Sequence, residues 1–101
     1  MESLGLLLKE KRQERGLILR KVAAAVDIDQ SLISKFEKNE RIPTKKQIIR
    51  LADFYKINAK EIIIKWYSQK IYDVLEDQED AMQILKVAEA RIAYKSKQKQ
   101  K

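Results

Sequence analysis

The chain has 101 residues, enough for one compact domain with a small appendage. Apolar residues make up 45% and charged residues 37%, with only two Gly and one Pro, a composition typical of a helical protein. The absence of Cys and His excludes disulfides, thiolate nucleophiles, imidazole bases and the commonest transition-metal ligands, while the net charge of +7 favours a phosphate-rich partner. We therefore expect no enzymatic activity and no cofactor.

The sequence contains no apolar run of about 18 residues and no signal-peptide pattern, so we expect a cytoplasmic protein with no membrane partner. Ser3 can cap a first helix that runs to about Arg15, where Gly16 supplies the stop. The segment 19–26, LRKVAAAV, predicts a short second helix because its small and apolar residues recur at helical spacing.

A turn and a third helix come next. Asp29 is placed to cap a helix over 30–38, and Asn39 is a plausible end. Pro43 prevents this helix from continuing, and Thr44 opens a capping box with Gln47 that begins a fourth helix ending near Tyr55.

Two further helices are predicted in the remaining chain. Asn58 begins a fifth helix that extends to the acidic cluster 76–80, either as one long helix or as two with a bend near Ser68. A last helix from about Gln78 to Tyr94 has apolar residues at helical spacing. The acidic cluster itself is more typical of a helix cap and a solvated turn than of a metal site.

Two short helices joined by a three-residue turn, with one helix before them and two after, form the order of a helix-turn-helix domain. From about Leu4 to Ile63, the segments LRKVAAAVDIDQSLISKFEKNERIP and LADFYKINAKEII resemble the phage-repressor (Cro/CI-like, XRE-type) family. The residues that carry the resemblance are Val22, Ala23, Ile28, Ile33, Phe36, Glu37, Pro43, Leu51, Ala52, Ile57, Ile62 and Ile63. The resemblance implies an all-α fold, a five-helix lambda-repressor-like helix-turn-helix domain with extra C-terminal helices, and binding to double-stranded DNA.

The third helix is the candidate for base recognition. Ile33 and Phe36 are spaced to face the core, which leaves four polar residues outward. In the major groove Gln can bond adenine, Lys can reach guanine, and Ser adapts to either base. The predicted base-contacting residues are Gln30, Ser31, Ser34 and Lys35. Any helix has a polar outer face, so it is the matching family register that favours DNA contact.

The resemblance also implies phosphate contacts from the start of the second helix, the loop after the third, and the start of the fourth. The candidates there are Arg20, Lys21, Lys38, Arg41, Thr44, Lys45 and Lys46. Taken singly each Lys is better explained as a solvated charge, but together they form a basic stripe that would position the domain on DNA.

A structural ion pair between Arg12 and Glu37, joining the first and third helices, is implied by the same resemblance. The chain departs from the family at three helix ends, where Asp27, Asn39 and Lys56 stand in place of the usual Gly. Leu19 replaces the family's frequent Gln at the start of the second helix, so we expect Arg20 to make the DNA contact that this Gln makes.

The domain boundaries predicted from these patterns are 1–66 for the helix-turn-helix domain, 67–94 for a helical extension and 95–101 for a disordered basic tail. The apolar residues of the extension need cover, either from another helix of the same chain or from a second chain in a homodimer. The predicted dimer or inter-helix anchors are Trp66, Tyr67, Ile71, Leu75, Ile84 and Leu85.

Two functions remain open at the level of sequence. The first is a sequence-specific transcription regulator that binds a palindromic operator as a dimer, within which a restriction-modification controller, a phage-type repressor and an antitoxin are not separable. The second is a protein-interaction module, such as an antitoxin or adaptor, in which the helix-turn-helix serves as a scaffold for a protein partner.

Overall fold

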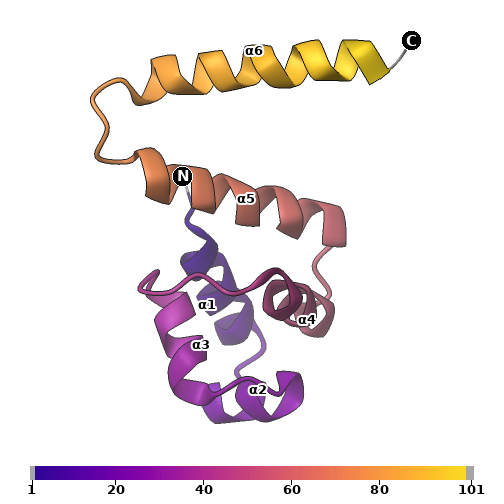
Figure 1. The fold of residues 1–101 in the computed structure, drawn as a ribbon. Helices are drawn as coiled ribbons and strands as arrows, with labels where there is room; N and C mark the ends of the chain where they lie inside the picture. The colour runs from indigo at the N-terminus through magenta and orange to yellow at the C-terminus, as the bar shows by residue number, and fades with distance from the viewer. Residues whose placement is uncertain (1, 100–101) are drawn as a thin grey trace. The chain divides into compact units, whose positions relative to one another are not determined.

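The computed structural model describes residues 2–99, which form six helices and no strand (Figure 1). The helices are α1 (Leu4–Glu14), α2 (Leu19–Val26), α3 (Gln30–Glu37), α4 (Lys45–Tyr55), α5 (Ala59–Leu75) and α6 (Ala81–Lys99). The chain divides into two units after Ile71. Every residue of the hydrophobic core lies between Leu4 and Trp66, so the first unit contains the whole core.

Three side chains cap the helix starts that the sequence predicts, namely Ser3, Asp29 and Thr44. The Ser3 hydroxyl accepts from the Leu6 N–H at 3.1 Å at the start of α1. At the start of α4, Thr44 and Gln47 form a reciprocal capping box, in which each backbone N–H donates to the other's side-chain oxygen. These bonds satisfy N–H groups that the first helical turn leaves without an intrahelical acceptor.

Left-handed backbone is found at each of the three helix ends where the family has Gly. Asp27, Asn39 and Lys56 have φ values of 56°, 60° and 58°. Asp and Asn reach this region at modest cost, whereas Lys has no side chain that compensates locally. Lys56 nevertheless takes the left-handed conformation. Its N–H donates to the Asp53 carbonyl at 3.2 Å.

Gly5 allows α1 to approach α3 closely. A Cβ atom at this position would lie 2.7 Å from the Glu37 carbonyl oxygen and 2.6 Å from Asn39 Oδ1, and would collide with the Phe36 carbonyl oxygen. Such contacts are closer than packed atoms allow, so only glycine fits this crossing without displacing a helix.

Each of the two C-terminal helices is continuous. α5 runs through Ser68 as one helix, the first of the two predicted alternatives, and the Ser68 hydroxyl donates to the Ile64 carbonyl at 2.7 Å. α6 continues to Lys99, so residues 95–99, predicted as part of a disordered tail, are helical in the structure; residues 100–101 lie outside the described residues. Lys and Gln are good helix formers, and a bond from Gln98 Nε2 to Tyr94 Oη at 2.8 Å spans one turn of this segment.

Candidate nucleic-acid interface

The inner face of α3 packs into the hydrophobic core and leaves the outer face of the helix exposed. Ile33 and Phe36 are nearly inaccessible to solvent, while Gln30 and Lys35 are exposed. An open hollow of about 570 Å³ runs along this face from α2, and its lining includes Leu19 together with these two exposed residues. Gln30 and Lys35, both long and polar, thus line an open hollow at the surface beside α2.

The two serines of α3 are less available than the sequence predicts. Ser34 is half-buried, although it lines the same hollow. The Ser31 hydroxyl donates to the Asp29 carboxylate, which also accepts from the Ser31 and Leu32 N–H groups. These bonds lower the pKa of Asp29, the hydroxyl of Ser31 contributing first. Ser31 is exposed, but in this structure its hydroxyl hydrogen is used within the helix cap.

The predicted phosphate contacts occupy exposed positions on three segments. Arg20 and Lys21 lie in the first turn of α2, and Lys38 and Arg41 lie after α3. The remaining three, at the start of α4, are Thr44, Lys45 and Lys46. The first-turn N–H groups of a helix have no intrahelical acceptor, so the start of α4 offers both charge and N–H donors to an anion.

Two of the residues at the start of α4 have other contacts as well. The Thr44 hydroxyl accepts from the Gln47 N–H at 3.2 Å, and the Lys45 ammonium lies 5.8 Å from the centre of the Tyr67 ring. A cation above an aromatic face is held weakly at an exposed site. The Lys45 ammonium thus lies beside the Tyr67 ring while the residue remains exposed.

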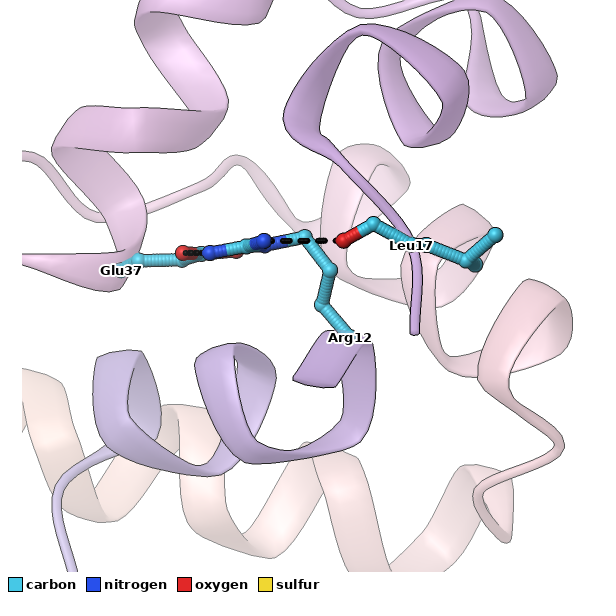
Figure 2. A network of polar contacts seen from close by, with 3 residues as sticks. All are labelled: Arg12, Leu17 and Glu37. Carbon is cyan, nitrogen blue, oxygen red and sulfur yellow. Dashed lines mark hydrogen bonds and ion pairs between the residues drawn. The ribbon is translucent and has the colours of Figure 1, made fainter. Parts of the chain in front are cut away.

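Arg12 and Glu37 form a bidentate ion pair between α1 and α3 (Figure 2). Arg12 Nε donates to Glu37 Oε2 at 2.8 Å and Nη2 donates to Oε1 at 2.9 Å. A third bond runs from Nη1 to the Leu17 carbonyl at 2.9 Å. The side chains are 15% and 5% exposed, so the pair is shielded from water, and the bond with Glu37 raises the pKa of Arg12. One guanidinium thus fixes α3 against both α1 and the loop before α2.

Asn39 and Arg50 make structural hydrogen bonds that the sequence does not predict, because their partners are distant in the chain. Asn39 Oδ1 accepts from the Gly5 N–H at 3.0 Å, and Asn39 Nδ2 donates to the Ser3 hydroxyl at 2.8 Å. Arg50 Nη1 donates to the Val26 carbonyl at 3.1 Å, at the end of α2. The glycine inside a predicted helix is the one sequence signal that indicates a close approach here.

Of the predicted dimer or inter-helix anchors, Trp66 is used within the first unit. It is 5% exposed, its indole N–H donates to the Pro43 carbonyl at 2.8 Å, and the Lys70 ammonium lies 4.1 Å from its ring centre. Trp66 therefore holds α5 to the segment that leads into α4. Tyr67, Ile71 and Ile84 are exposed, whereas Leu75 and Leu85 are half-buried.

Residues 2–99 contain neither a membrane-spanning helix nor a metal-binding cluster. None of the helices within this range has the length and apolar character needed to cross a bilayer. Within the same range, no three acidic side chains gather into a cluster able to hold a metal ion.

The model of a family described as Helix-turn-helix matches residues 8–62, more than half of the chain. The matched range contains α2, α3, α4 and the ion pair of Figure 2. Searches of curated proteins and of solved structures found no match.

Proposed function

Because the chain belongs to the Cro/CI-like (XRE-type) helix-turn-helix family, we propose that it is a sequence-specific transcription regulator that reads bases with α3. The observation that carries the proposal is the exposure of Gln30 and Lys35 on a helix whose inner face is buried and whose end is fixed by Glu37. Gln suits adenine and Lys suits guanine acceptors in the major groove. Ser34, half-buried in the same hollow, is proposed as a secondary contact, and Ser31 as an acceptor only.

The distribution of charge supports phosphate binding by the first unit. Through Ile71 the sequence has sixteen Lys and Arg against nine Asp and Glu, which gives this unit the whole net charge of +7. The remainder has six of each and is neutral. Electrostatic affinity for DNA grows with the number of phosphates neutralised, so the first unit carries the attraction.

A dimer on a palindromic operator is the form of binding we propose. Regulators of this type place two recognition helices in successive major grooves, with half-sites about one helical turn, ~34 Å, apart. Exposed apolar side chains in the C-terminal helices supply surface for a second chain, among them Tyr72, Val74, Met82 and Val87.

The same apolar surface favours one second candidate, a protein-interaction module in which another protein covers the C-terminal helices. Selection of bound sequences from a random double-stranded DNA pool separates the two candidates. Enrichment of a palindrome supports the dimeric regulator. No enrichment, together with equal affinity for all DNA, would support the interaction module.

Substitutions on α3 and α4 test which residues read bases. We expect Gln30→Ala or Lys35→Ala to weaken binding to the selected sequence by roughly 1–3 kcal/mol and to leave random-sequence binding nearly unchanged. Lys46→Gln is the matched control, because loss of a phosphate contact should weaken both and reduce the salt dependence. Fluorescence anisotropy at several salt concentrations measures these effects. Equal losses on both DNAs for Gln30→Ala would contradict base reading by α3.

A further inference from the structure

The second unit contains a helix whose apolar stripe is still accessible to solvent. Ile84, Leu85, Ala88 and Ile92 recur at intervals of one, three and four residues and so share one face of α6. Ile84 is 43% and Ile92 67% exposed. In proteins most of the stability of a helix comes from packing of its apolar face, so a stripe of this kind requires a covering surface.

Opposite charges lie at the two ends of the same helix. The segment 76–80 just before α6 contains four acidic residues, whereas Lys95 and Lys97 lie in its last turns. The helix macrodipole favours this polarity within one chain, but it gives no reason for the exposed apolar stripe. A partner with the same stripe and the reverse polarity would satisfy both features.

We infer that the partner of α6 is the α6 of a second copy of this chain, packed antiparallel and crossing near Ala88. At 1.5 Å per residue, Asp80 lies ~12 Å before Ala88 and Lys95 ~10 Å after it, so crossing there brings each acidic end beside the basic end of the other helix. A parallel pair would instead set acid against acid and Lys against Lys. The small side chain of Ala88 permits close approach at the crossing.

The α6 pairing specifies which surface joins the two chains of the proposed dimeric regulator. It rests on that proposed function only in so far as both have two-fold symmetry. Two antiparallel copies of one helix are related by a two-fold axis, which is also the symmetry of a palindromic operator. The pairing itself requires no DNA and can be measured without it.

Disulfide cross-linking in the full chain tests the pairing, and the absence of native Cys makes each engineered thiol unique. Ala81 and Lys95 lie seven residues on either side of Ala88, so we expect Ala81→Cys mixed with Lys95→Cys to form a disulfide-linked dimer. Neither variant alone should do so. Ala88→Cys should cross-link with itself, and Ala90→Cys, on the opposite face of α6, is the matched control that should not.

Each alternative gives a different result. Ala81→Cys linking to itself would indicate parallel helices, and failure of Ala88→Cys would indicate a stripe covered within one chain or by another protein; either result overturns the inference. A palindrome selected from random DNA would still support the proposed regulator in both cases, so the two proposals fail separately.

Reversing the charges at the ends of α6 tests whether its partner is a second copy of this chain. Lys95→Glu with Lys97→Glu should raise the dimer dissociation constant about tenfold in sedimentation experiments, and mixing this chain with one carrying Glu79→Lys and Asp80→Lys should restore association as a heterodimer. Unchanged dissociation constants in all combinations would overturn the role of the charged ends.

Discussion

Gly5 and Gly16 are the two glycines of the chain, and they serve different physical needs. Gly16 has φ of +63° and open space around it, so its role lies in its own backbone. Gly5 lies within α1 against the carbonyl groups at the end of α3, so its role is the absence of a side chain. Only the second requirement depends on residues far away in the sequence.

We expect Gly5→Ala to lower the free energy of unfolding by roughly 1–3 kcal/mol, because the new methyl group would push α1 away from α3. In an isolated helix the same change stabilises by about 1 kcal/mol, so the sign distinguishes packing from propensity. Urea unfolding followed by circular dichroism measures it. Gly16→Ala is the control, with a cost near 1 kcal/mol from backbone strain alone. A Gly5→Ala variant as stable as the parent chain would contradict the close approach.

At the scale of elements, the orientation of α3 depends on one shielded ion pair. Arg12 and Glu37 meet through two parallel hydrogen bonds, whereas Lys11 and Glu14 form an exposed pair at 3.7 Å along α1. Removing one member of a shielded pair leaves the other charged and poorly solvated. An exposed pair is largely screened by water and salt.

We therefore expect Glu37→Gln to lower the free energy of unfolding by roughly 3 kcal/mol, and Glu14→Gln to change it by less than about 1 kcal/mol. Glu37→Gln should also reduce affinity for the selected operator under conditions where the variant is still folded, because α3 loses its fixed angle to α1. Urea unfolding and anisotropy on the same samples give both values. Similar stability losses in the two variants would show that the shielding of Arg12 has no energetic role.

At the scale of the whole molecule, burial is concentrated in the first unit. All residues of the core lie between Leu4 and Trp66, while most side chains of α6 are exposed. The stability of the first unit thus comes from contacts among its own residues. Helix α6 has few buried contacts of its own, and its stability should depend on association.

Hydrogen exchange at two protein concentrations tests this difference. Amides of α6 should gain protection as the concentration rises through the dimer dissociation constant, whereas amides of α1–α4 should be equally protected at both concentrations. The α4 amides in the same sample are the internal control. Protection of α6 that does not depend on concentration would show that its stripe is covered within the chain.

The sequence by itself determined the features that act over a few residues. Ser3, Asp29 and Thr44 are helix caps, and Asp27 and Asn39 take left-handed backbone at helix ends, all because a side chain or backbone acts on its near neighbours. The same local periodicity gave all six helices and the inner face of α3. For residues 95–99 the composition suggested disorder, whereas the structure has them in α6.

Only the tertiary structure decided which surfaces remain available. Ser31 and Ser34 look equivalent to Gln30 by spacing, but a bond to Asp29 and partial burial set them apart. The sequence left Trp66 open as a dimer or an inter-helix anchor, and the Pro43 carbonyl accepts its N–H inside the first unit. Asn39 and Arg50 acquired structural roles through partners more than twenty residues away. Chain folding brings such groups together, and spacing along a sequence carries no record of those distances.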